Sequence, residues 1–189
     1  MAIDQAFSSF PVLKTDRLIL RKLKKTDVPN MFSYFSQEEV TKYYDLESFT
    51  SEKQAEELIE RFFNRYEEKK QIRWAITLKE SDELIGTCGF HSIEPEHRKA
   101  EIGYELHPTF WGKSIMTEAV SAIIQFGFNE MTLNRIEALY DPRNMSSGRV
   151  LEKCGFEYEG VMRKRYFEKG KFVDAAIAAI LNENNLKSS

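Results

Sequence analysis

A predicted strand that leads through a short glycine-containing turn into a predicted helix most constrains how this chain folds. Residues 101–106 have strand-like composition and are followed by Pro108, a turn around Gly112 and a helical pattern that opens at Ser114. The first N–H groups of a helix have no partner inside it and carry the positive end of its dipole. This segment is therefore suited to binding a phosphate or a pyrophosphate.

The turn at residues 112–114 partly matches an ATP-binding motif. Gly112, Lys113 and Ser114 have the order found at the end of an ATP-binding P-loop. That motif requires a glycine five positions before Gly112, and the residue there is His107. The sequence therefore argues against a P-loop nucleotide hydrolase.

Composition and charge exclude several other classes. The chain has 189 residues, 27 basic and 30 acidic, with a net charge of −3, so bulk electrostatics gives no case for nucleic acid as a partner. No apolar run approaches the roughly 20 residues needed to cross a bilayer, so no membrane-spanning helix and no membrane partner are expected. The start shows no signal-peptide pattern. We therefore expect a single cytoplasmic domain over residues 1–189, with frayed ends at 1–10 and 182–189.

Cysteine and histidine usage predicts neither a disulfide nor a metal site. Cys88 and Cys154 are far apart and are interpreted as small buried thiols in a reducing compartment. The histidines at 91, 97 and 107 have spacings that match no standard zinc pattern.

Hydrophobic periodicity and turn residues predict alternating strands and helices. Strands are expected at 17–23, 72–78, 84–92, 100–106, 135–140, 157–167 and 172–181. Helices are expected at 28–35 after an N-cap at Thr26 or Asp27, from Thr50 or Ser51, with a capping box between Ser51 and Gln54, at 114–129 and at 146–154. This order predicts an α/β or α+β domain with one mixed sheet and helices on both faces.

Several segments, in order from residue 15 to residue 174, together resemble one known family. They are 15–21 (TDRLILR), 100–104 (AEIGY) with 111–114 (WGKS) and 117–119 (TEA), 144–147 (NMSS) with 150–156 (VLEKCGF), and 159–160 (EG). The chain resembles the GNAT acetyltransferases, and in particular their RimJ/RimL-like branch, which acetylates protein N-terminal or other primary amines. The resemblance implies a mostly antiparallel seven-stranded sheet that is splayed between its fourth and fifth strands, 101–106 and 135–140.

The resemblance also implies acetyl-CoA as the donor and no metal. The residues implied to bind it are Leu106, Trp111, Gly112, Lys113, Ser114, Ile115, Met116, Thr117, Asn144 and Ser147. Lys113 is equally well interpreted as a solvated surface lysine, and Asn144 as a helix cap. Two family positions differ, with Thr109 in place of Gln or Arg and Ser114 in place of Gly or Ala. We expect Ser114 to enter the helix without a positive φ, and its hydroxyl is suited to capping the helix.

The implied catalytic residues are Ser147, whose hydroxyl serves the leaving sulfur, and Glu101, which deprotonates the amine. The alternatives are a helix-capping serine and a carboxylate paired with a basic residue. A glutamate base found on a late strand in part of the branch is replaced here by Tyr166. A backbone N–H near Leu106 is the natural oxyanion donor.

Acceptor selection is assigned to the loop 43–49 and the last hairpin. Tyr43, Tyr44, Glu47 and Tyr166 suit a cationic amine, although core packing is the alternative for the aromatic rings. The acceptor is a protein N-terminus or a small-molecule amine, and the chain is a monomer or a homodimer. The alternative function is a non-catalytic acyl-CoA-binding or sensing module.

Overall fold

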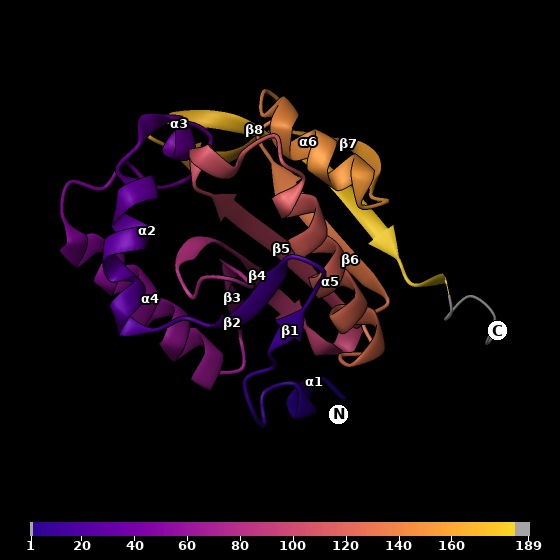
Figure 1. Ribbon diagram of the computed structural model, residues 1–189. Helices are drawn as coiled ribbons and strands as arrows, with labels where there is room; N and C mark the ends of the chain where they lie inside the picture. The colour runs from indigo at the N-terminus through magenta and orange to yellow at the C-terminus, as the bar shows by residue number, and fades with distance from the viewer. Residues whose placement is uncertain (1, 184–189) are drawn as a thin grey trace.

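A computed structural model describes residues 2–183 of the chain (Figure 1). Its helices are α1 (Ala2–Gln5), α2 (Val28–Phe35), α3 (Glu38–Thr41), α4 (Glu52–Glu67), α5 (Ile115–Asn129) and α6 (Met145–Lys153). Its strands are β1 (Leu13–Lys14), β2 (Leu18–Lys22), β3 (Ile72–Leu78), β4 (Leu84–Glu94), β5 (Lys99–Leu106), β6 (Arg135–Tyr140), β7 (Glu157–Glu168) and β8 (Lys171–Leu181). Short 3-10 turns lie at Lys25–Asp27, Pro95–His97 and Pro108–Phe110.

The strands form one mixed sheet in the order β1-β2-β3-β4-β5-β6-β8-β7. Within residues 2–183, β5 and β6 are the only parallel neighbours, and their pairing runs from Lys99–Arg135 to Glu101–Glu137. Beyond this point the two strands diverge, so the mostly antiparallel, splayed sheet is confirmed. The prediction of seven strands is wrong, because the described residues form eight. The additional β1 has two residues, too few to show an alternating pattern.

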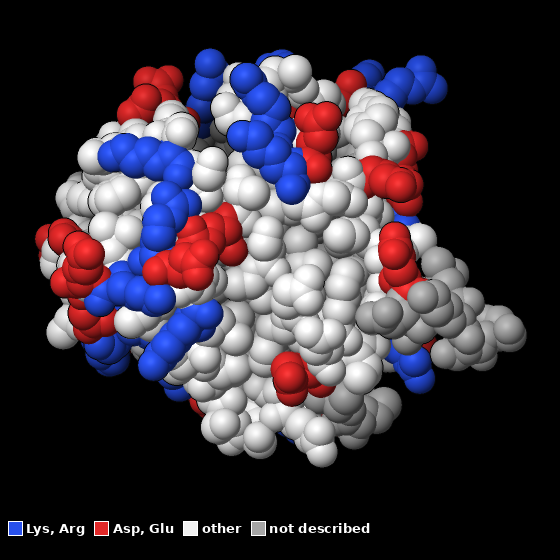
Figure 2. All heavy atoms as spheres, turned by 45° about the vertical axis from the view of Figure 1, so that its right-hand side comes forward, with Lys and Arg blue, Asp and Glu red and all other residues white. Residues whose placement is uncertain are grey.

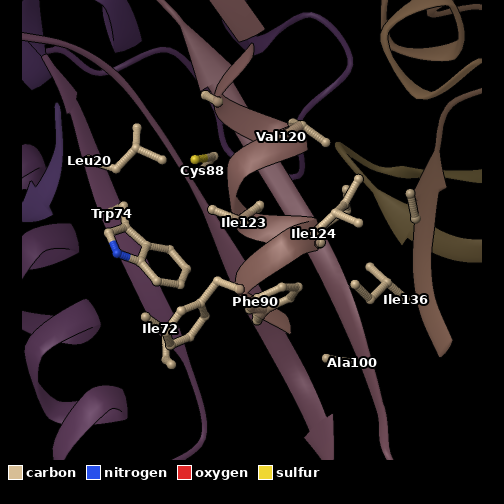
Figure 3. Close-up of a cluster of buried hydrophobic side chains, with 14 of the residues drawn as sticks. Leu20, Ile72, Trp74, Cys88, Phe90, Ala100, Val120, Ile123, Ile124 and Ile136 are labelled. Atoms are coloured by element: carbon tan, nitrogen blue, oxygen red, sulfur yellow. The ribbon is translucent and has the colours of Figure 1, made fainter. Parts of the chain in front are cut away.

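Helices cover both faces of the sheet, and each face has its own hydrophobic core (Figure 1). On one face, Trp74 and Phe90 of the sheet pack with Ile123 and Ile124 of α5 (Figure 3). On the other face, α2 and α4 pack over side chains such as Ala75. Successive strand residues point to opposite faces, which is why Trp74 and Ala75 belong to different cores. The sheet thus packs between two layers of helices, which hold β5 and β6 in place on either side of the splay.

Two helix starts test the predicted caps. The capping box of α4 is confirmed, since the Gln54 side-chain oxygen accepts the Ser51 backbone N–H at 3.2 Å. Asp27 is the N-cap residue of α2, as the sequence predicts, but its side chain makes no capping hydrogen bond to the helix. Its carboxylate instead accepts two hydrogen bonds of 2.8 Å from the Arg21 guanidinium and one from the Lys24 backbone N–H. A buried arginine recruits the carboxylate more strongly than the helix end does.

The expected fraying of the ends differs from the structure where the structure describes them. Residues 2–10 include α1, and Ile3 and Ala6 contribute to the core. At the other end, Asn182 is buried and its amide donates to the Leu133 carbonyl at 3.2 Å. Residues 184–189 lie outside the described part of the chain.

Charges of both signs are mixed on the surface. Figure 2 shows basic and acidic side chains beside one another, with an uncharged area in the middle of that face, so neither sign dominates it. Over residues 2–183, no helix is both long enough and apolar enough to span a membrane.

Candidate active site

A cavity of about 500 Å³ occupies the splay between β5 and β6. Its walls come from both strands, from the first turn of α6, from α4, from the loop after α3 and from the β7–β8 hairpin. This volume is typical of small-molecule sites. The lining includes Glu101, Asn144, Ser147, Tyr43, Tyr44 and Tyr166 from the sequence-predicted set, together with Tyr104.

The turn before α5 enters the helix through left-handed backbone. Gly112 has a φ of +72°, and a Cβ added there would meet no atom of the described chain within 4 Å. Ser114 has a φ of +57°, and its hydroxyl caps no N–H of the described helix. The expectations that Ser114 avoids positive φ and that its hydroxyl caps α5 are therefore wrong. Serine adopts this left-handed conformation at a cost that glycine would not have.

Replacing Ser114 by glycine is expected to stabilise the protein slightly. Relief of left-handed strain is worth about 1–2 kcal/mol, and the greater freedom of glycine in the unfolded chain removes about 0.4–1 kcal/mol. The net gain is about 0.5 kcal/mol, measured as a raised urea midpoint. Ser114→Ala serves as the control, because alanine keeps the Cβ that is strained in left-handed backbone. If the glycine variant is no more stable than the alanine variant, residue 114 is not strained.

The N-terminus of α5 has the free backbone N–H groups that a pyrophosphate requires. The first intrahelical bond runs from the Glu118 N–H to the Ser114 carbonyl at 3.1 Å, so the N–H groups of residues 115–117 point out of the helix end. Ile115 and Met116 have buried side chains and therefore offer their amides alone. Lys113 is exposed, with its ammonium 5.4 Å from the centre of the Phe110 ring.

Side-chain contacts fix this turn to the sheet. The Trp111 indole N–H donates to the Leu106 carbonyl at 2.8 Å. Glu118 accepts hydrogen bonds from the Thr15 hydroxyl and the Arg17 guanidinium, both at 2.6 Å. The sequence identified Trp111, but the contact of Glu118 with residues a hundred positions earlier could be found only in the fold.

A hydroxyl pair lies beside the cavity at the start of α6. The Ser147 hydroxyl is 2.8 Å from the Tyr104 hydroxyl, and the Ser147 N–H donates to the Asn144 side-chain oxygen at 3.1 Å. Asn144 is therefore the N-cap of α6, its alternative interpretation, and it also lines the cavity. Burial raises the pKa of Tyr104, which keeps its proton on the phenol. The sequence did not identify Tyr104 as part of the site.

Glu101 is the titratable group best placed for proton transfer. Burial, with the Glu137 carboxylate opposite it on β6, raises its pKa to about 7. His91 lies 3.8 Å away, but burial lowers the pKa of His91 to about 4. At neutral pH the imidazole is uncharged and forms no ion pair with Glu101. A carboxyl group that is half ionised near neutral pH is suited to general base catalysis.

A buried network supports the cavity floor. The Glu105 carboxylate accepts hydrogen bonds from Arg73 and Thr87, and from the hydroxyls of Tyr34 at 3.4 Å and Tyr44 at 3.3 Å. Arg73 and Glu105 are both buried. By strand alternation Glu105 lies on the same face of β5 as Glu101, but the sequence analysis assigned it no role. Its only signal was the presence of opposite charges within two apolar strands.

The predicted acceptor residues are only partly brought together. Tyr43, Tyr44 and Tyr166 line the cavity, whereas Glu47 is exposed and lies outside it. The Tyr44 hydroxyl is already bonded to Glu105, so this residue offers its ring alone. The carboxylates of the cavity wall come instead from Asp45, Glu101, Asp141, Glu168 and Asp174. Within residues 2–183, no group of three His, Cys, Asp or Glu side chains could hold a metal ion.

A mixed sheet splayed between β5 and β6, free N–H groups at the start of α5 and a cavity carboxyl with a raised pKa are the features that the resemblance to amine acetyltransferases predicts. The family description "acetyltransferase (GNAT) domain" matches residues 17–157. The chain belongs to the GNAT acetyltransferase family and is an N-acetyltransferase, which confirms the resemblance seen in the sequence.

Relatives and solved structures agree with this membership. An uncharacterised N-acetyltransferase of Bacillus subtilis (strain 168), YoaA, is 42% identical over 172 residues, covering 91% of this chain and 97% of the relative. A GNAT-family acetyltransferase structure from Bacillus anthracis superposes with a TM-score of 0.81 at 30% identity, covering 90% and 98% of the two chains. RimL, the ribosomal L7/L12 alpha-N-protein acetyltransferase in complex with coenzyme A, also reaches 0.81, at 20% identity and with 90% and 98% covered, which shows a common fold. None of these similarities supports the non-catalytic sensing alternative.

Proposed function

We propose that the protein transfers acetyl from acetyl-CoA directly to a primary amine in its cavity. The observation that carries the proposal is the placement of Glu101 and the Tyr104–Ser147 hydroxyl pair in one cavity. The RimL relative, captured with coenzyme A, supports the choice of donor.

The residues of this chain fit the donor. The outward-pointing amides of residues 115–117 suit the pyrophosphate, and the space around Gly112 lets a phosphate approach the backbone. Lys113 adds a cation nearby. The edge of β5 beyond Glu101, which has left β6, suits the pantetheine amides in the manner of an added strand. Bound acetyl-CoA supplies the activated acetyl thioester.

The side chains divide the proton transfers between them. Glu101, when ionised, accepts a proton from the acceptor ammonium, directly or through water, and so generates the nucleophilic amine. As the new C–N bond forms and the C–S bond breaks, the second amine proton goes to the departing sulfur, which leaves as the thiol. The Ser147 hydroxyl donates a hydrogen bond toward that sulfur, and the Tyr104 hydroxyl, 2.8 Å away, holds Ser147 in place. A backbone N–H near Leu106 serves as oxyanion donor.

The cysteines support direct transfer. Cys88 is buried, and burial raises its pKa to about 12. Cys154 is half-buried and its pKa is also raised by burial. Since the thiolate is the nucleophilic form, neither residue is suited to carry the acetyl group.

Ser147→Ala tests the proposal. We expect kcat to fall about 100-fold, the lower range for loss of a proton donor, because the leaving sulfur loses its hydrogen bond. Coenzyme A affinity, measured by calorimetry, should stay within about twofold, because most donor contacts come from backbone. Thiol release is followed with N-terminal peptides and small amines as acceptors.

Tyr104→Phe is the matched variant, since it keeps the ring and removes only the hydroxyl that orients Ser147. It should lower kcat less than Ser147→Ala does. The double variant should have nearly the same kcat as Ser147→Ala alone, because the two hydroxyls act together. Unchanged kcat in Ser147→Ala contradicts the assigned role, and tight coenzyme A binding without turnover on any amine contradicts the proposed function.

A further inference from the structure

The cavity has two ends of opposite charge. Arg61 and Arg65, one turn apart on α4, line one end beside His91. Asp45 and Glu168 line the other end, where the β7–β8 hairpin meets the loop after α3. Glu101 is the carboxyl on β5 beside His91, 3.8 Å from its ring nitrogen.

The basic end carries charge that the protein leaves unpaired. The Arg65 Nε is buried with no hydrogen-bond acceptor in the described chain, and over residues 2–183 neither Arg61 nor Arg65 has a carboxylate within 4 Å. A buried donor without a partner costs about 1–3 kcal/mol, which a bound acceptor atom would relieve.

Three glutamates on or just after α4 are paired with lysines. The carboxylate of Glu57 lies 3.9 Å from the Lys53 ammonium, that of Glu60 lies 3.9 Å from Lys25, and that of Glu68 lies 2.8 Å from Lys70. Neither arginine forms an ion pair with these glutamates, although the pKa of Glu68, lowered mainly by its hydrogen bond with Lys70, is lowered further by Arg65. Arg65 is half-buried and Arg61 is exposed, and both line the cavity. Consistent with a positive local field, Arg73 and Arg65 add to the effect of burial in lowering the pKa of His91.

The acidic end is correspondingly negative. Burial, with Asp45 and Asp141 nearby, raises the pKa of Glu168. Asp141 is paired with Arg143 at 2.5 Å, which leaves Asp45 and Glu168 facing the cavity without an ion pair among the described residues. A cationic amine that enters from this end approaches Glu101 along a negative wall.

We propose that the acceptor is a zwitterionic small molecule, in which Arg65 and Arg61 bind a carboxylate or phosphate group a few bonds from the amine that Glu101 deprotonates. This specificity rests on the proposed function. Arginine binds both oxyanions with two parallel hydrogen bonds, so the chemistry is shared, and the acceptor pairs below distinguish the two.

The test compares matched acceptors with and without the oxyanion. Tyrosine is compared with tyramine, and O-phosphoethanolamine with ethanolamine, using thiol release from acetyl-CoA. We expect kcat/KM to favour the oxyanion member of at least one pair by about 10- to 100-fold, as for a charge-assisted hydrogen bond. Arg65→Gln should remove most of this preference by raising KM, with Arg61→Gln as a weaker second variant. Lys53→Gln, on the same helix but with an exposed side chain, is the charge-matched control.

A binding measurement separates this inference from the proposed function. Calorimetry with the preferred zwitterion, on free and coenzyme A-bound protein, should show binding that Arg65→Gln weakens at least tenfold and Lys53→Gln leaves unchanged. Equal turnover of both members of each pair, unaffected by either arginine variant, overturns the inference while the acetyltransferase function stands. Zwitterion binding that depends on Arg65 without any thiol release supports the subsite and overturns the proposed chemistry.

Discussion

Replacing Glu101 by glutamine is expected to lower kcat by about 100- to 10,000-fold, the range for loss of a general base. Glutamine has nearly the same shape but cannot accept the proton of the acceptor ammonium. The measurement is steady-state thiol release at saturating acetyl-CoA and acceptor. Coenzyme A affinity should change little, because the side chain lies in the cavity and away from the turn before α5.

The pH dependence gives this prediction its specific signature. With a pKa of about 7 for Glu101, kcat should rise about tenfold per pH unit below that value and level off above it. The ionised form is the active one, so activity is lost as pH falls. In Glu101→Gln this fall of kcat at acidic pH (the acidic limb of the profile) should disappear. A variant that keeps both the limb and the rate shows that another group is the base.

The same substitution is expected to stabilise the folded protein at alkaline pH. The folded state holds the Glu101 proton up to a pKa of about 7, against 4.5 without the fold. Between these values the folded state binds more protons than the unfolded one, so stability falls as pH rises through the window and is flat above it. Glutamine removes this penalty, which is at most about 3 kcal/mol. Urea unfolding at pH 8 and pH 4.5 measures it, and equal effects at both values contradict the raised pKa.

Sequence patterns predicted the elements well where periodicity and caps agreed. The start of α4 and the Ser51–Gln54 capping box depend on local residues, and both are confirmed. The two-residue β1 and the positive φ of Ser114 were missed for a physical reason. Each is imposed by neighbours far along the chain, so no local pattern of residues announces it.

The site divides in the same way. Glu101, Asn144 and Ser147 were predicted because their segments resemble family motifs, and the structure gathers them around one cavity. Tyr104 and Arg65 were not predicted, because what singles them out is a hydroxyl contact and a missing hydrogen-bond acceptor. Such properties depend on which strands and helices become neighbours, and a single sequence carries no direct record of that.

Removing Arg73 is expected to be the most destabilising single change in the site. Arg73→Met leaves the Glu105 carboxylate buried without its cation, which costs about 3–5 kcal/mol. Although burial alone would lower the pKa of Arg73, the neighbouring Glu105 carboxylate raises it, so Arg73 stays charged in the native state. For a chain of this length the midpoint of thermal unfolding should fall by about 6–20 °C. Urea unfolding followed by circular dichroism gives the free energy directly.

The double variant Arg73→Met with Glu105→Leu decides whether this loss comes from the stranded charge. Replacing both partners by apolar groups removes the uncompensated carboxylate, so stability should recover by at least about 2 kcal/mol relative to Arg73→Met alone. Recovery should remain incomplete, because the hydroxyls of Tyr34 and Tyr44 lose Glu105 as an acceptor. Tyr44 then loses its tie to the cavity floor, so KM for the acceptor should rise while coenzyme A affinity is kept. If the two substitutions are instead additive, Arg73 stabilises the protein through packing on Phe62, 5.4 Å from its guanidinium, rather than by neutralising Glu105.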